Sequence, residues 1–293
     1  GQGGPRCARY VYLEVEAFEG ECYMTQTYGE QDLRFIATTL AEKSDQVPVL
    51  LSQLRRPEFL EVALEDARLV ERIRTDPDIT LKISPRLLFA ILLRQVARDV
   101  RHARYTLERV GLRESVPIFD TPRVNQLLDD EEVLDYLAAM LASFVRTETY
   151  VVHVWHRGRL QRLRFSDLNM DDMVRLAQLV EEPYRFPLLR RIADIALFLT
   201  GVFPGYVLSR GGYARTVRPG RALGGEWRSL EEYEQQGATF YRLAAEHRDA
   251  AESGLRRVLE RLSEDFPAAR KPLSLLADRY LRWQHLRLFW HLQ

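Results

Sequence analysis

Apolar side chains recur every three or four positions through most of this chain, which is the spacing of helices that bury one face. The clearest example starts at Pro85, where Leu87, Leu88 and Ile91 open an apolar stripe. The stripe predicts a long helix from Pro85 to about Val110, ended by Gly111. A proline in the first turn and Ser84 as the N-cap are typical of such a helix start.

The same spacing predicts further helices along most of the chain. Prolines precede several of them, at Pro48, Pro57, Pro122 and Pro183, and Ser229 forms a capping box with Glu232. The predicted helices cover residues 30–40, 85–110, 122–128, 131–145, 170–180, 183–203, 230–263 and 268–292, and two more follow Pro48 and Pro57. We therefore expect a mainly α fold, an irregular array of about nine or ten helices in a single domain that spans residues 1–293.

Two segments instead alternate apolar and polar residues, which is the pattern of β-strands. Residues 8–28 predict an extended segment that turns at Glu19-Gly20, and residues 148–165 predict a β-hairpin that turns at Arg157-Gly158. Pairing His156 with Arg159 places one apolar face of the hairpin inward, with Tyr150, Val152, Val154, Leu163 and Phe165. An isolated hairpin is marginally stable, so this face must pack on the helices or join the N-terminal segment.

Composition fits a globular protein, because 46% of the residues are apolar and 29% are charged. No apolar run reaches the roughly 18 residues of a membrane span, so we expect a soluble, cytoplasmic protein without a membrane partner. Cys7 and Cys22 are too few for a disulfide framework or a structural zinc site. A reduced environment is the simplest interpretation, although these two cysteines could pair across the N-terminal segment.

Candidate catalytic and metal-binding patterns are weak in this sequence. His153 and His156 are three apart on a strand, so their side chains point to opposite faces. Asp99 and His102 share a helix face, but no second pair completes a di-metal site. The acidic run Asp129–Glu132 is best interpreted as a helix cap. Phosphate-binding glycine loops and the serine nucleophile elbow are missing, so we predict no cofactor and no metal.

Positive charge is supplied almost entirely by arginine. The chain has 42 lysine and arginine residues, balanced by 42 acidic residues, and only Lys43, Lys82 and Lys271 are lysines. Coding bias in a GC-rich genome accounts for arginine that is spread over the whole chain. Two stretches are locally basic, namely residues 94–113, with six arginines, and residues 208–228, with five arginines, three of which lie between the glycine pairs Gly211-Gly212 and Gly224-Gly225. The candidate anion- or partner-binding residues are therefore Arg94, Arg98, Arg101, Arg210, Arg215, Arg218 and Arg221.

Other charge and apolar patterns suggest alternatives to ligand binding at these arginines. Residues 57–78 contain seven acidic residues against three arginines, so acidic and basic stretches can pair within one chain or between two copies. Large apolar residues crowd the end of the predicted last helix, including Trp283, Phe289 and Trp290. The rest of the same fold, a partner or a second copy must cover them.

Three classes of function are compatible with these patterns. We favour a non-catalytic interaction or regulatory protein, whose partner is a protein or a second copy of the chain. The first alternative is a nucleic-acid-associated protein that uses the helix of residues 94–113 and the loop of residues 208–228. The second alternative is an enzyme with a dispersed site, formed by Asp99, His102, Tyr105 and Asp194.

Overall fold

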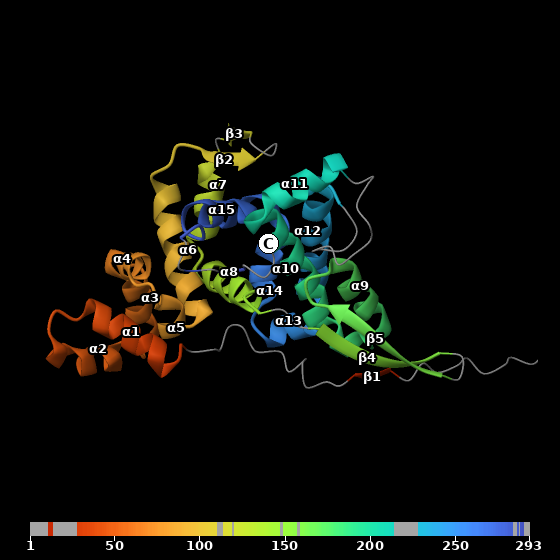
Figure 1. The fold of residues 1–293 in the computed structure, drawn as a ribbon, viewed down its shortest axis with the longest axis horizontal. Coiled ribbons are helices and arrows are strands. Elements are labelled where there is room, and N and C mark those ends of the chain that lie inside the picture. The colour runs from red at the N-terminus through yellow and green to blue at the C-terminus, as the bar shows by residue number, and fades with distance from the viewer. Residues whose placement is uncertain are drawn as a thin grey trace, which may run out of the picture.

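The fold is mainly α-helical, as the sequence predicts (Figure 1). The computed structural model describes residues 11–13, 28–109, 114–118, 120–146, 149–156, 159–213, 228–283, 286, 288 and 289. These residues form fifteen α-helices and two small antiparallel sheets, one of three strands and one of two. None of the described helices combines the length and the apolarity that a membrane span requires.

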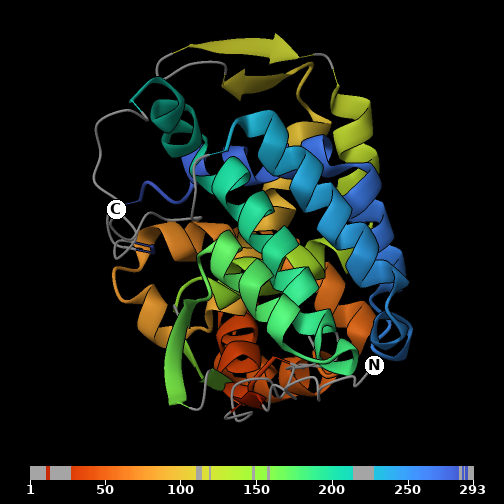
Figure 2. The same cartoon turned by 90° about the vertical axis from the view of Figure 1, so that its right-hand side faces the viewer.

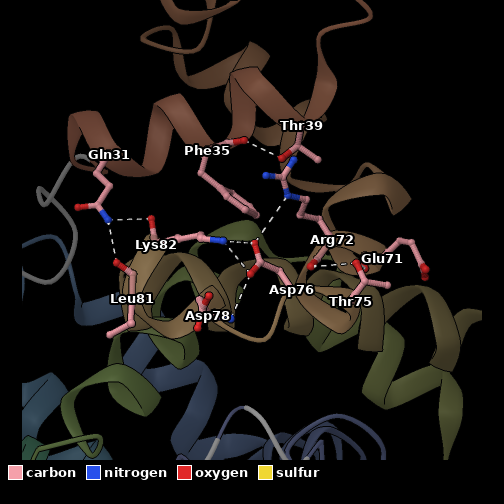
Figure 3. Close-up of polar contacts among 10 residues, drawn as sticks. All are labelled: Gln31, Phe35, Thr39, Glu71, Arg72, Thr75, Asp76, Asp78, Leu81 and Lys82. Carbon is pink, nitrogen blue, oxygen red and sulfur yellow. Dashed lines mark hydrogen bonds and ion pairs between the residues drawn. The ribbon is translucent and has the colours of Figure 1, made fainter.

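Five short helices form an N-terminal layer that packs beside the first long helix, α6 (Figure 1). Polar contacts hold this layer together (Figure 3). The Asp76 carboxylate accepts hydrogen bonds from Lys82 Nζ at 2.8 and 2.7 Å. Gln31 Nε2 donates to the carbonyls of Leu81 and Lys82, which the end of helix α5 leaves free. The layer consists of α1 (Glu30–Leu40), α2 (Val47–Gln53), α3 (Pro57–Leu64), α4 (Ala67–Thr75) and α5 (Ile79–Lys82).

The remaining helices form the helical body, which surrounds helix α10 (Figure 2). Of the 17 residues of α10, 14 are buried, and α9, α12 and α15 pack against it. The body consists of α6 (Pro85–Arg101), α7 (Thr121–Leu128), α8 (Glu131–Ser143), α9 (Met170–Leu179), α10 (Phe186–Val202), α11 (Pro204–Tyr213), α12 (Leu230–Glu246), α13 (Arg248–Glu252), α14 (Arg256–Glu264) and α15 (Phe266–Arg279).

Two glycines let the helices of the body approach closely. A Cβ atom at Gly201 of α10 would lie 2.7 Å from Cβ of Leu273 in α15. A Cβ atom at Gly237 of α12 would lie 2.4 Å from Cε2 of Phe266 and 3.0 Å from Cβ of Ala196 in α10. Only a residue without a side chain fits at these two points, so the helix spacing in the body depends on both glycines.

The predicted hairpin is confirmed with its register. Strands β4 (Thr149–His156) and β5 (Arg159–Ser166) are antiparallel and pair His156 with Arg159. Val152 is fully buried and Phe165 is 5% exposed, so the predicted face packs inward. The N-terminal segment joins the same sheet through β1 (Val11–Leu13), which pairs with β4. The rest of residues 8–28, up to residue 27, lies outside the described part of the chain.

The predicted helix over residues 85–110 is wrong in its last nine residues. Helix α6 ends at Arg101, and residues 106–109 form strand β2, which pairs with β3 (Ser115–Ile118). Leu107 is 61% exposed and therefore does not continue the buried stripe. Glu108 instead forms an ion pair with Arg270 of α15, whose Nη2 donates to Oε1 of Glu108 at 2.6 Å. Arg270 is only 3% exposed. This tertiary contact and the strand pairing override the local helical pattern.

Other helix boundaries differ from the sequence prediction. The long region 230–263 is divided into α12, α13 and α14, and a 3-10 helix at Glu182–Tyr184 precedes α10. Residues 208–213, predicted as irregular, belong to α11. Helix α7 begins at Thr121, one residue before its predicted start, and Asp120 is the N-cap residue. The predicted last helix ends at Arg279.

Among the apolar residues after α15, Leu286 and Phe289 are covered by the protein itself, whereas Trp290 lies outside the described residues. Phe289 is 2% exposed and stacks on Phe89 of α6 with a ring separation of 5.9 Å. Its ring also meets the edge of Phe198 in α10 at 5.1 Å. Phe289 has a φ of 60°, a conformation that is rare for bulky residues. The packing of three segments in one aromatic cluster therefore holds the chain in an unfavourable backbone conformation.

We expect Gly237→Ala to lower the free energy of unfolding by about 1–3 kcal/mol. The added methyl group overlaps the Phe266 ring, which outweighs the better helix propensity of alanine. Urea denaturation measures the change, and Gln235→Ala, at an exposed position of the same helix, is the control. An unchanged midpoint for Gly237→Ala would show that α12 and α15 do not rely on this close approach.

Candidate functional site

Arg94, which the sequence singles out, is buried at the junction of the N-terminal layer with the helical body. Its side chain extends from α6 and is 2% exposed. Nη2 donates to Glu61 of α3 at 2.5 Å and to Asp135 of α8 at 3.0 Å, and Nε donates to Glu61 at 3.1 Å. One guanidinium group thus joins three helices through charge-assisted hydrogen bonds.

The other two predicted arginines of α6 are also engaged within the chain. Arg98 donates to the backbone carbonyl of Glu65 and to Gln95. Arg101 forms a half-exposed ion pair with Asp129 at 2.9 Å. Arg94, Arg98 and Arg101 therefore do not make up one free basic face. The pairing of the acidic stretch 57–78 with α6, one of the alternatives raised by the sequence, occurs here within a single chain.

The arginines of the second basic stretch can be located only in part. Arg215, Arg218 and Arg221 lie outside the described residues, and Arg210 falls within α11, where its side chain is not described. Arg228, at the end of the stretch, is described. It pairs with Asp171 of α9, donates to Gln236 at 2.8 Å and lies 5.9 Å above the Tyr233 ring. The stretch is thus anchored to α9 and α12 where α12 begins.

Two residues that the sequence prediction missed lie near Arg94. Arg86 is the second residue of α6, and its guanidinium carbon lies 5.7 Å from the ring centroid of Tyr28, which precedes α1. Both side chains are partly exposed. Nε and Nη1 of Arg86 and the hydroxyl of Tyr28 are buried atoms without a hydrogen-bond partner in the described part of the protein. Unsatisfied buried donors are uncommon in folded proteins and call for a physical reason.

Burial keeps the Tyr28 hydroxyl of this Tyr28–Arg86 site in its protonated form. Burial raises the pKa of Tyr28 far above its ordinary value, and the charge of Asp135 adds to the effect. Arginine remains charged at any physiological pH. Burial also raises the pKa of Glu61, although Arg94 opposes that shift. Nε and Nη1 of Arg86 and the hydroxyl of Tyr28 are thus polar groups whose hydrogen-bonding capacity is unused among the described residues.

One signal in the sequence could have indicated Arg86. An arginine on a helix commonly pairs with an acidic residue three or four positions away. The positions that follow Arg86 at this spacing are Phe89 and Ala90, and Lys82 precedes it. No local acid is therefore available to Arg86. Tyr28 carries no comparable signal, because its place beside α6 results from the tertiary fold.

The residues of the proposed dispersed enzyme site do not share a cleft. Asp194 is 1% exposed in α10, where Tyr136 of α8 and Tyr241 of α12 donate to its Oδ1 at 2.6 and 2.8 Å. Asp99 instead bonds to Arg279 and Tyr280 at the end of α15. The two remaining candidates, His102 and Tyr105, are exposed. Asp194 and Asp99 thus belong to separate polar networks, and the Asp194 network is sealed inside the body.

Metal ligation finds no support in the residues that the structure describes, since no group of three or more His, Cys, Asp or Glu side chains is placed to hold an ion there. Cys7 and Cys22 lie outside that part of the chain.

Comparisons with protein-family models, with curated protein sequences and with solved structures yield no match to this chain. Its function is therefore inferred from the geometry of the chain itself.

We expect Arg94→Met to lower the free energy of unfolding by about 3–5 kcal/mol, because it leaves Glu61 and Asp135 unpaired in a largely buried place. Chemical denaturation measures the loss. Arg101→Met, which removes an exposed ion pair from the same helix, is the matched control and should lose less than about 1 kcal/mol. The triple variant Arg94→Met, Glu61→Gln, Asp135→Asn should recover part of the loss. Equal losses for both single variants would contradict a central role for Arg94.

We expect Asp194→Asn to become more stable relative to the unmodified protein as the pH rises. Burial raises the pKa of Asp194 in the folded state. Its stabilisation is therefore complete below the unfolded pKa of about 3.9 and is lost as the pH rises through the higher folded value. Asparagine keeps the oxygen that accepts from both tyrosines and does not ionise. Denaturation at a series of pH values tests this, with the exposed Asp45→Asn as control; a constant difference would refute it.

Proposed function

We propose that this chain is a non-catalytic regulatory protein that binds a small oxyanion, a carboxylate or phosphate group, between the N-terminal layer and the helical body. The observation that supports the proposal is the set of buried donors at Tyr28 and Arg86 that lack acceptors among the described residues. A buried donor without a partner costs about 1–3 kcal/mol. A bound anion would supply acceptors and remove that cost.

The charge distribution favours an anion over a neutral ligand. Both nearby carboxylates, Glu61 and Asp135, already accept hydrogen bonds from Arg94. Arg86 itself has no ion pair among the described residues. Its interaction with the Tyr28 ring is a cation–π contact, which leaves the hydrogen-bonding capacity of the guanidinium unused. Two of the three guanidinium nitrogens are enclosed, and this favours a small ligand.

The position of the site accounts for a regulatory role. Tyr28 leads directly into α1, the first helix of the N-terminal layer, and Arg86 begins α6 of the body. A ligand that bonds to both residues links the two parts and stabilises their association, since ligands stabilise the state that binds them.

The alternative enzyme site has less support, because its candidate residues lie in separate networks. The nucleic-acid alternative is weakened because the α6 arginines are paired within the chain.

The test is thermal unfolding with sulfate, inorganic phosphate or acetate at constant ionic strength, with chloride as the reference salt. At an anion concentration ten times the Kd, the stabilisation is about 1.4 kcal/mol, which raises the Tm of a chain of this length by roughly 2 °C. We expect Arg86→Gln and Tyr28→Phe to reduce or abolish the shift. Arg34→Gln, at an exposed position of α1, should retain it. A shift that survives in Arg86→Gln, or that is missing for all three anions in the unmodified protein, would refute this site.

A further inference from the structure

The outer strand of the three-stranded sheet has a positively charged edge that no described strand covers, although the amide of Ser166 at its end donates to Asp172 of α9. The strand order is β1-β4-β5, so β5 is an edge strand among the described strands. In Figure 1 the hairpin of β4 and β5 extends past helix α9 at its turn end. An exposed edge presents unpaired backbone donors and acceptors, to which another extended chain can add.

The strand register shows which side chains lie along the β5 edge. Arg162 is opposite His153 and Arg164 is opposite Val151, on the face away from the buried Val152 and Phe165. Arg162 and Arg164 are exposed, as is Arg159 at the start of the strand. None of these three arginines has an ion pair or hydrogen bond with a described residue, in contrast to Arg94, Arg98 and Arg101 of α6. By alternation Arg159 lies on the other face of the strand, so Arg162 and Arg164 give the outward face of β5 a positive charge that is uncompensated within the described sheet.

We propose that β5 binds an extended acidic peptide segment of a partner protein by addition of a fourth strand to the sheet. Side chains two residues apart on a strand lie on one face. Acidic residues at alternate positions of the added strand would therefore face Arg162 and Arg164 as cross-strand pairs of opposite charge. The backbone hydrogen bonds supply affinity and the charge pairs supply selectivity.

Two different roles of the β5 arginines would give different binding results. Charged side chains on an edge strand commonly prevent strand addition and aggregation, in which case no peptide binds. A single-stranded nucleic acid would contact the arginines through its phosphates and would not need the backbone edge. The spacing of the arginines along an open edge, rather than over a broad face, favours the peptide.

The binding experiment uses fluorescence anisotropy with a labelled peptide of alternating glutamate and valine. The full-length protein should bind this peptide and should not bind the corresponding peptide of lysine and valine. The variant Arg162→Glu, Arg164→Glu should lose about tenfold or more in affinity for the acidic peptide and should gain affinity for the basic one. The double variant Arg175→Glu, Arg242→Glu changes two exposed arginines outside the sheet and should bind as the unmodified protein does.

The contribution of the edge is tested by N-methylation of alternate peptide bonds in the acidic peptide. Strand addition requires those amide donors, so methylation should abolish binding. Equal binding of the methylated peptide, preferential binding of single-stranded DNA, or no binding of either peptide would each overturn the proposal. Far-ultraviolet circular dichroism and an unchanged Tm would establish that the variants are folded. The effect of Arg86→Gln on the sulfate-induced Tm shift tests the oxyanion site separately, so the two proposals can fail independently.

Discussion

Helix α10 lies inside the molecule with nearly all of its residues covered, and its burial determines how the surrounding helices are arranged. A helix that is buried on all sides must find partners for every polar group it carries. Asp194 is the critical group, and hydroxyls from α8 and α12 satisfy it. Gly201 and Gly237 then permit the close approach of α15 and α12. The Asp194 carboxylate and two glycines, which have no side chain, thus fix the positions of α8, α12 and α15.

Charge organises the contact between the N-terminal layer and the body. The arginines of α6 mostly meet acids or carbonyls of the same chain, so a locally basic sequence does not become a basic surface. Arg86 differs because its helix neighbours are apolar and its buried nitrogens have no described acceptor. The arginines of β5 differ because they stand on an exposed edge. Both proposed binding sites therefore use cations that have no acidic partner in the described part of the fold, rather than the stretches with the highest arginine content.

The sequence was sufficient for features that depend on local pattern. The fold class, the β4–β5 register and the starts of α3, α6 and α12 follow from periodicity, turn residues and caps. The end of α6 was missed because residues 102–110 satisfy a helical pattern, while Glu108 is drawn to Arg270, which lies far away in the sequence. Arg94 was identified as a binding residue from its spacing, yet its burial depends on Glu61 and Asp135 from two other helices. The Tyr28–Arg86 site was missed for the same reason, since no local pattern places Tyr28 beside α6.

The aromatic cluster around Phe289 has a consequence for synthesis of the chain. Phe89, Phe198 and Phe289 come from widely separated parts of the sequence, and their contacts complete the core between α6 and α10. Contacts between residues so far apart in sequence form late and slowly. While the ribosome is still adding the residues before position 289, the rings of Phe89 and Phe198 lack this cover. The emerging chain therefore carries an apolar surface that needs protection until the last of these rings has been made.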